Sequence, residues 1–459
     1  MVLSRVRFAI LAAAVLVVAQ GLVIDHIELT FDEAYYALWA RWPQAGYFDH
    51  PPMVAWGIAA SQALFGGSEF GVRALFWLAG ASLPGLVFAL GRRLYGDTEI
   101  AATATLFYLG APLLAGAPLA TPDTPLVLFW TLALLGLVEV WRANAWGWAL
   151  VGAAAGAAGL SKLTAGFLGF GIVLALAATP SLRRQFARPG PYAAAALALA
   201  VLSPFLSWNA THGFATFLKQ GGRLGARAFA PRYLAEFVGS QLLLFNPLTA
   251  ALALRGVAAR RGAPDEATRL LLAVSAPLLG YFLIHALHDR VQGNWPAPLY
   301  PAMALLAARA AAPRAGAPLT AALGVAVAAA LYAHLATGQP ALGPADPALR
   351  IGGWRDVAAR VRKEADARGA AFVLAKGYAA TSLLTYYGAP ATQAGEPERW
   401  RFRPPVSVYG EGLAFGPPDF GAELKSRFGR VTPLETVARR VAGREMESYR
   451  LFSVSGVTP

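Results

Sequence analysis

The chain has 459 residues, of which 56% are hydrophobic and only 14% are charged. A soluble globular protein would carry roughly a quarter charged residues, so this composition excludes an ordinary soluble enzyme and indicates a membrane protein. The absence of cysteine excludes disulfides, thiolate metal sites and a cysteine nucleophile.

Basic residues exceed acidic ones by 39 to 26, which gives a net charge of +13. They occur in short clusters between apolar runs rather than on one soluble face, so we expect no nucleic-acid partner. The excess fits contact with membrane lipids and the enrichment of Lys and Arg in cytoplasmic loops.

Hydropathy predicts about eleven transmembrane helices, the first of them retained rather than cleaved as a signal peptide. We place them at 5–24, 71–93, 100–117, 124–142, 146–160, 163–179, 190–208, 237–255, 268–287, 296–312 and 318–336. If they alternate, one side of the membrane, which should be the cytoplasm, receives the basic clusters Arg5/Arg7, Arg92/Arg93, Arg142, Arg183/Arg184/Arg188, Arg255/Arg260/Arg261 and Arg309/Arg314. The opposite side receives 25–70, 118–123, 160–163, 209–236, 288–295 and everything after about 337.

The composition changes after residue 340, where charged and strand-forming stretches replace the apolar runs. We expect helices over 353–368 and 379–387 and short strands near 371–374, 405–409 and 448–454. The fold class is therefore a polytopic α-helical membrane protein with a small C-terminal α/β domain. Its transmembrane domain covers 1–336 with an outward loop at 25–70, and the α/β domain covers 340–459.

The first outward loop carries aromatic residues at helical spacing, which predicts a short helix in the membrane interface: Phe31, Tyr35, Trp39 and Trp42. Asp32 and Glu33 begin this helix. Carboxylates at that position often cap free N–H groups, so capping is the alternative to a catalytic role for Asp32.

Other polar residues fall on the same side. Asp49 and His50 open a second amphipathic stretch, and Asp123 either caps the fourth span or serves a site. Lys162 lies between two apolar segments. A lysine near membrane depth usually has a function or an acidic partner, and snorkelling to the surface is the alternative. His288, Arg290, Asn294 and Trp295 lie between the ninth and tenth spans.

A site at the outer face of an inner membrane has no nucleotide sugar available, and the chain has no P-loop or dinucleotide fingerprint. An activated donor must arrive on a lipid, for which a polyprenyl-phosphate-linked sugar is the natural candidate. Its transfer needs a carboxylate as general base for the acceptor hydroxyl and cations for the leaving phosphate. Asp32 suits the base, and the phosphate is suited by Lys162, His50 and Arg290.

Several motifs resemble the bacterial protein-mannosyltransferase-like glycosyltransferases of the membrane-embedded GT-C class, which include aminoarabinose and galacturonic acid transferases acting on lipopolysaccharide. The resemblance covers about 1–310 and rests on F-D-E-A-Y-Y-A-L-W-A, G-Y-F-D-H-P-P-M, T-P-D-T-P, G-L-S-K-L-T-A and G-N-W-P-A-P-L-Y-P. The tail segment A-K-G-Y-A-A-T-S-L-L-T-Y-Y-G is also similar.

The resemblance implies an inverting transfer with Asp32 near the acceptor hydroxyl and a second acidic motif at Asp49. Lys162 matches the lysine of the G-L-x-K segment. His50 stands where aminoarabinose transferases have a lysine, which argues against aminoarabinose as the sugar. The family commonly works without metal, so we predict no required cofactor. The outward carboxylates would permit a divalent ion, but they show no regular ligand spacing.

We therefore predict a glycosyltransferase in the bacterial inner membrane, with its active site and C-terminal domain facing the periplasm. The acceptor would be lipopolysaccharide or lipid A, another glycan or a protein. We expect catalytic roles for Asp32, Glu33 and Asp49, phosphate binding by His50, Lys162 and Arg290, and other substrate contacts from Tyr35, Tyr36, Asp123, His288, Asn294 and Trp295.

Three alternatives stay open. A flippase or transporter for a lipid-linked sugar would need polar residues through the membrane with access to both faces, whereas these candidates crowd one face. A glycan polymerase or ligase would use a similar site. A scaffold for other membrane enzymes would explain the spans but not the outward acids and cations.

Overall fold

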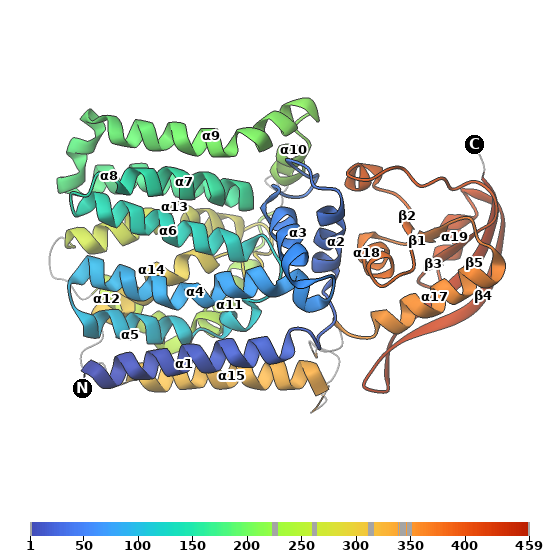
Figure 1. The fold of residues 1–459 in the computed structure, drawn as a ribbon, viewed down its shortest axis with the longest axis horizontal. Coiled ribbons are helices and arrows are strands. Elements are labelled where there is room, and N and C mark those ends of the chain that lie inside the picture. Colours follow the sequence, from blue (N-terminus) through green and yellow to red (C-terminus); the bar gives the residue numbers. More distant parts are fainter. Residues whose placement is uncertain are drawn as a thin grey trace. The chain divides into compact units, whose positions relative to one another are not determined.

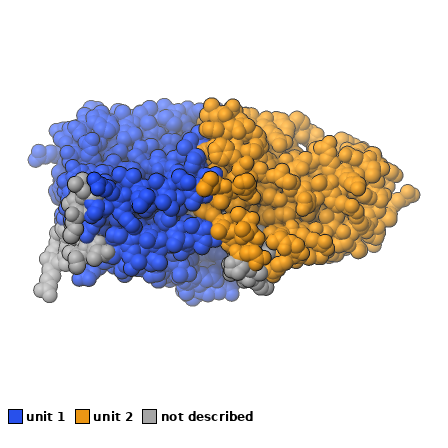
Figure 2. Space-filling model, turned by 60° about the horizontal axis from the view of Figure 1, so that its bottom comes forward, with its two compact units in different colours: residues 1–21, 45–54, 75–330 blue, residues 22–44, 55–74, 331–459 orange. Residues whose placement is uncertain are grey.

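The computed structural model describes residues 2–222, 228–258, 264–310, 316–337, 339, 346 and 351–457. The chain divides into two compact units, coloured separately in Figure 2. Unit 1 comprises residues 1–21, 45–54 and 75–330, and unit 2 comprises residues 22–44, 55–74 and 331–459.

Unit 1 is helical, and its long helices run nearly parallel to one another (Figure 1). The helices that lie wholly or mostly in unit 1 are α1 (Val2–Val23), α4 (Glu69–Tyr95), α5 (Thr98–Leu109), α6 (Asp123–Trp141), α7 (Gly147–Ser161), α8 (Gly166–Ala178), α9 (Pro189–Thr211), α10 (Ala215–Gly221), α11 (Arg232–Phe245), α12 (Pro247–Ala258), α13 (Glu266–His285), α14 (Tyr300–Ala310) and α15 (Ala317–Thr337). Short 3-10 helices connect them: η1 (Pro112–Gly116), η2 (Leu163–Ala165), η3 (Pro180–Ala187) and η5 (Ala297–Leu299).

Within the described residues, six helices are long and apolar enough to cross a membrane, and two bent helix pairs bring the number to at most eight. The predicted count of eleven is therefore not confirmed. The predicted span 100–117 ends as an α-helix at Leu109, and the predicted span 237–255 bends by 103° between α11 and α12. Pro247 explains that break, because proline lacks the N–H that a continuing helix would need.

Close packing of α6 against α7 brings the start of α6 and the end of α7 together, where the candidate site residues Asp123 and Lys162 lie. α6 and α7 form an antiparallel hairpin in which Gly136 and Gly147 face each other, and a Cβ added to either would meet backbone atoms of the other helix at less than 3 Å. The start of α6 and the end of α7 therefore lie at the same end of the hairpin. The turn 142–146 lies at the other end, where Arg93 pairs with Glu139.

The structure describes only part of the predicted loop 209–236 and of the predicted basic clusters. In the connection predicted at 209–236, α9 continues to Thr211 and α10 follows, whereas 223–227 lie outside the described residues. Of the predicted basic clusters, Arg260, Arg261 and Arg314 also lie outside them.

Unit 2 contains a five-stranded sheet of order β2-β1-β3-β5-β4. Its strands are β1 (Val373–Ala375), β2 (Thr392–Gln393), β3 (Gly412–Gly416), β4 (Phe428–Val441) and β5 (Arg444–Val457). β2, β1 and β3 are parallel, whereas β5 is antiparallel to both β3 and β4. Ala442 and Gly443 both have positive φ in the two-residue turn between β4 and β5, as a twisted hairpin requires.

The helices of unit 2 are α2 (Phe31–Arg41), α3 (Met53–Phe65), α17 (Trp354–Arg368), α18 (Tyr378–Tyr386) and α19 (Phe420–Leu424), with a 3-10 helix η7 (Pro397–Trp400). The predicted helices 353–368 and 379–387 are confirmed as α17 and α18. The predicted strand 448–454 lies within β5, but the predicted strand 405–409 is wrong. Pro404 and Pro405 begin that segment and cannot donate to a sheet ladder.

The predicted helix of the first outward loop is confirmed as α2, but its aromatic residues have a different role. Tyr35 and Trp39 are buried within unit 2, where α2 packs on α18. Their rings lie within 6.5 Å of rings from the C-terminal residues Tyr378, Trp400 and Phe402. The interpretation of these rings as a membrane-interface belt is therefore wrong, although Phe31 is exposed.

Candidate active site

Lys162 lies where α7 ends and η2 begins, in extended conformation between the two helices. Its Nζ lies 2.6 Å from Oδ1 of Asp123, and the two side chains are only 11% and 13% exposed. The lysine is thus paired with an acid inside unit 1, so the snorkelling alternative is wrong. A buried ammonium group needs such a partner because its isolated charge would be costly to desolvate.

Asp123 is the first residue of α6, yet its side chain does not cap the helix. Its second oxygen, Oδ2, accepts a hydrogen bond from Nδ2 of Asn294 at 2.8 Å. The carboxylate therefore bridges Lys162 and Asn294. The Lys162 ammonium also lies 5.6 Å from the centre of the Trp295 ring. Four predicted residues from three separate motifs are thus brought together.

A cavity of about 250 Å³ opens beside Lys162. Its polar lining includes His50, Lys162, His285 and Gln220, and its walls are largely apolar or aromatic: Leu163, Phe167, Phe217, Tyr281 and Trp295. His50 and Lys162 were both predicted for phosphate binding. The sequence analysis did not select His285, because it ends the apolar helix α13. His288, three residues later in the polar connection, was selected instead.

A second cavity of about 150 Å³ is lined by Asp123 and Asn294, together with Tyr108 and Tyr300. The ion pair is therefore shared between two cavities, with the cation lining the larger and the carboxylate lining the smaller. The Lys162 ammonium group therefore faces the 250 Å³ cavity, and the Asp123 carboxylate faces the 150 Å³ cavity.

Three predicted residues of unit 1 lie elsewhere. Arg290 forms an exposed ion pair with Glu236 at 2.8 Å, and the exposed His288 has Nδ1 at 3.2 Å from the carbonyl of Ile284. Neither residue lines either cavity. Asp49 is buried, and its backbone carbonyl accepts a hydrogen bond from Gln220.

Asp32 lies in the first turn of α2 in unit 2. The hydroxyl of Tyr378 donates a hydrogen bond to its Oδ1 at 3.2 Å. The Arg399 guanidinium lies 4.4 Å from the centre of the Tyr378 ring, and the Tyr35 hydroxyl donates to the Arg399 carbonyl. Tyr378 was missed as a site residue, although it lies in the tail segment that resembles the family. Tyr36 is buried with its ring against Tyr35 and Trp39.

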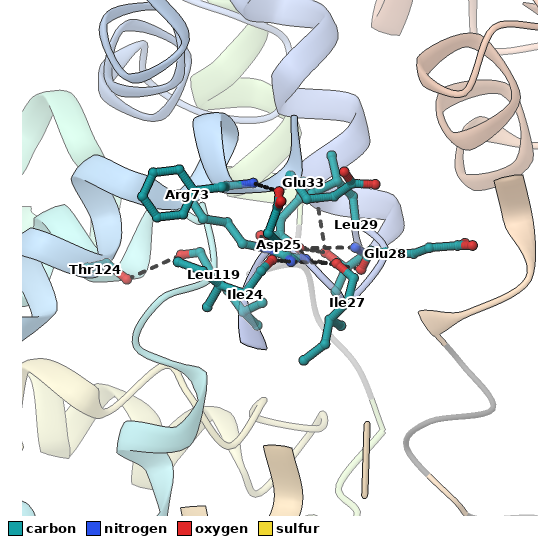
Figure 3. Close-up of polar contacts among 12 residues, drawn as sticks. Ile24, Asp25, Ile27, Glu28, Leu29, Glu33, Arg73, Leu119 and Thr124 are labelled. Carbon is teal, nitrogen blue, oxygen red and sulfur yellow. Dashed lines mark hydrogen bonds and ion pairs between the residues drawn. The ribbon is translucent and has the colours of Figure 1, made fainter. Parts of the chain in front are cut away.

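Capping at the start of α2 belongs to Thr30 and Glu33, not to Asp32. Thr30 and Glu33 form a reciprocal capping box. Glu33 also forms a buried ion pair with Arg73, with contacts of 2.7 and 2.8 Å. All five N–H donors of Arg73 are used, the other three by the carbonyls of Ile24, Ile27 and Glu28 (Figure 3).

The Glu28 carboxylate accepts a hydrogen bond from the backbone N–H of Trp354. Burial raises the pKa of Glu28 above its usual range. Because the folded carboxyl holds its proton more tightly than the unfolded one, its contribution to stability decreases as the pH rises through the folded pKa.

Among the described residues, no group of three His, Asp or Glu side chains could hold a metal ion.

Known proteins are similar to this chain in sequence and in fold. Residues 49–208 match the family model described as dolichyl-phosphate-mannose-protein mannosyltransferase. The crystal structure of ArnT from Cupriavidus metallidurans aligns with a TM-score of 0.71 at 16% identity, covering 97% of each chain. The chain has the GT-C fold. The same protein bound to undecaprenyl phosphate aligns with a TM-score of 0.70.

Curated relatives match parts of the chain. Lipid A galacturonosyltransferase RgtD of Rhizobium johnstonii is 28% identical over 292 residues, which cover 62% of this chain and 60% of that protein. An undecaprenyl phosphate-alpha-4-amino-4-deoxy-L-arabinose arabinosyl transferase of Pseudomonas aeruginosa is 34% identical over 172 residues, which cover 35% of this chain and 30% of that protein. The chain thus spans less than two thirds of the length of these relatives. The family resemblance is confirmed, and the GT-C-fold chain is a multi-pass membrane protein.

Proposed function

We propose that this chain is an inverting glycosyltransferase that moves a sugar from a polyprenyl-phosphate donor to an acceptor. The observation that supports this function best is the cavity beside Lys162, in which nitrogen-bearing side chains lie among apolar and aromatic walls. That combination suits a phosphate group that carries a long apolar chain. We place the protein in a bacterial inner membrane with this cavity open to the periplasm.

Lys162 would hold the donor phosphate. Its ammonium group has three N–H donors, and the 2.6 Å contact with Asp123 uses one of them. The other two are available to phosphate oxygens. The negative charge of Asp123 offsets the cost of an ammonium group near membrane depth, and His50 and His285 add hydrogen-bonding groups to the same cavity. As the sugar leaves, charge accumulates on the phosphate, and Lys162 would stabilise it.

Asp32 would act as the general base. The acceptor oxygen attacks the anomeric carbon on the face opposite to the phosphate, the bond from this carbon to the phosphate oxygen breaks, and Asp32 takes the hydroxyl proton. Polyprenyl phosphate leaves as the second product, so inversion follows from a single displacement. Tyr378 would orient the Asp32 carboxylate through its 3.2 Å hydrogen bond. Glu33 would fix the helix turn that carries Asp32, through Arg73.

The relatives support the substrate classes. The name of the rhizobial relative specifies lipid A, and that of the pseudomonad relative specifies undecaprenyl phosphate. We therefore propose an undecaprenyl-phosphate-type donor, and lipid A or another glycan at the outer leaflet as the acceptor.

Mass spectrometry of lipid A, other glycans and polyprenyl-phosphate sugars tests this function in cells with and without the gene. We expect deletion to remove one sugar from an acceptor and to increase the lipid-linked donor. Asp32→Asn should behave like the deletion, since losing a general base slows transfer by about 10²–10⁴-fold.

Asp356→Asn is the matched control, because Asp356 is an exposed acid in the first turn of α17. The Asp356→Asn protein should restore full activity to cells that lack the gene. Unchanged glycans after deletion would refute the proposed function. A fully active Asp32→Asn protein would refute the role of Asp32 alone.

A further inference from the structure

A third cavity, of about 640 Å³, lies at the other end of α6 and α7 from Lys162. It is formed by the turn between these helices, by η3 and by the beginning of α9. Its lining includes Trp141, Asn144, Trp148, Arg184, Gln185 and Arg188. None of these residues has a role in the proposed transfer.

This cavity and the cavity beside Lys162 lie at opposite ends of α6, a helix long and apolar enough to cross a membrane. α6 begins at Asp123, beside Lys162, and ends at Trp141, which lines the third cavity. Its 19 residues span roughly 28 Å at 1.5 Å per residue, which matches the hydrocarbon thickness of a bilayer. With the orientation proposed above, the cavity faces the cytoplasmic leaflet, but the inference itself does not depend on that orientation.

The cavity has an excess of positive charge. Among the described residues, the guanidinium groups of Arg184 and Arg188 have no hydrogen-bond or ion-pair partner. The nearby acid Glu266 is already engaged, because it accepts hydrogen bonds from Trp141 and from both the backbone and the hydroxyl of Ser181. The neighbouring Arg183 instead donates to a backbone carbonyl. The two lining arginines therefore offer donors that this part of the protein does not use.

The surrounding residues suit the membrane interface. Trp146, in the turn beside the cavity, is 56% exposed, and Tyr192 on α9 is also exposed. Trp and Tyr prefer the depth of lipid head groups. The first turn of α9 also has no side-chain cap, and Gly190 of that turn lines the cavity, so its backbone adds further positive potential.

We propose that this cavity binds the phosphodiester head group of an anionic glycerophospholipid. Arg184 and Arg188 would hold the phosphate oxygens through charge-assisted hydrogen bonds, and the tryptophans would contact the lipid at the boundary between head group and acyl chains. Basic pockets between membrane helices are typical sites for anionic lipid head groups. The bound lipid would tie the turn between α6 and α7 to η3 and α9.

The test uses the full-length protein, purified in detergent and titrated with phosphatidylglycerol, phosphatidylcholine or inorganic phosphate, with the thermal unfolding midpoint as the readout. We expect phosphatidylglycerol to raise the midpoint, and the other two probes to leave it nearly unchanged. In Arg184→Gln/Arg188→Gln the apparent affinity for phosphatidylglycerol should fall by roughly tenfold or more, because two charge-assisted hydrogen bonds are lost.

Arg7→Gln is the matched control for charge, because it removes an exposed arginine of α1 that lines no described cavity. It should respond like the wild type. An undiminished response of the double variant would overturn the site. An equal rise with phosphatidylcholine would overturn the selectivity for anionic lipid, and an equal rise with inorganic phosphate would overturn the lipid as the ligand. Normal unfolding of the double variant without lipid would confirm that it folds.

Discussion

Lys162 illustrates how one residue combines a structural cost with a chemical use. An ammonium group near membrane depth needs a compensating charge, and the Asp123 carboxylate at 2.6 Å supplies it. Asn294 occupies the other carboxylate oxygen and fixes the direction of the pair. The Lys162 side chain is thereby fixed at the cavity that it lines with His50 and His285, where a phosphate would need it.

Replacing Lys162 with methionine should raise the KM for the lipid-linked donor by about 10–100-fold, which corresponds to one or two charged hydrogen bonds. Steady-state kinetics with purified donor measures this change. Lys219→Met is the control, because Lys219 lies over the Phe48 ring and does not line the cavity.

Loss of Lys162 leaves the Asp123 carboxylate without its cation, so the single variant should also unfold more easily. Lys162→Met/Asp123→Asn removes that carboxylate charge and should recover stability while keeping the high KM. An unchanged KM in this double variant would show that Lys162 does not bind the donor.

At the scale of elements, α2 is held by two separate devices at its first turn. The capping box joins Thr30 to Glu33, and the buried ion pair joins Glu33 to Arg73. Arg73 in turn fixes the preceding turn of backbone through three carbonyls (Figure 3). The position of Asp32 depends on this turn, since it lies between the capping residue and Glu33.

Glutamine can replace glutamate in a capping box, so Glu33→Gln removes the ion pair while it keeps the cap. We expect this substitution to cost about 3–5 kcal/mol, because it leaves a buried guanidinium without its carboxylate. Thr30→Ala should cost only about 1 kcal/mol. Chemical unfolding in detergent measures both variants, and a smaller cost for Glu33→Gln than for Thr30→Ala would show that the cap rather than the ion pair holds α2.

At the scale of the whole molecule, the absence of cysteine makes the membrane topology directly measurable. Tyr409 in unit 2 is 75% exposed, and Trp146 lies in the turn at the far end of the α6–α7 hairpin from Lys162. A single cysteine at either position would be the only thiol in the chain.

We expect a membrane-impermeant maleimide to label Tyr409→Cys in cells whose outer membrane has been permeabilised. Trp146→Cys should react only after the inner membrane is lysed. The opposite pattern of labelling would place the C-terminal residues in the cytoplasm, and the proposed periplasmic transfer would then be wrong.

The amino-acid sequence by itself determined the membrane class, the helix α2, the helices α17 and α18, and the need of Lys162 for an acidic partner. These properties depend on composition, on residue spacing over a few turns, and on the cost of a charge at membrane depth. The family motifs also pointed to His50, Asn294 and Trp295. In the structure His50 and Trp295 line the same cavity as Lys162, and Asn294 donates a hydrogen bond to Asp123, the partner of Lys162.

Only the tertiary structure decided which groups are partners. Asp123 lies 39 residues before Lys162, and Tyr378 lies 346 residues after Asp32. Local spacing carries no information about such distant contacts, so Asp123 was open between capping and function, and Tyr378 had no assigned role. The burial of Tyr35 and Trp39 likewise depends on rings more than 300 residues away, since an aromatic stripe looks the same whether lipid or protein covers it.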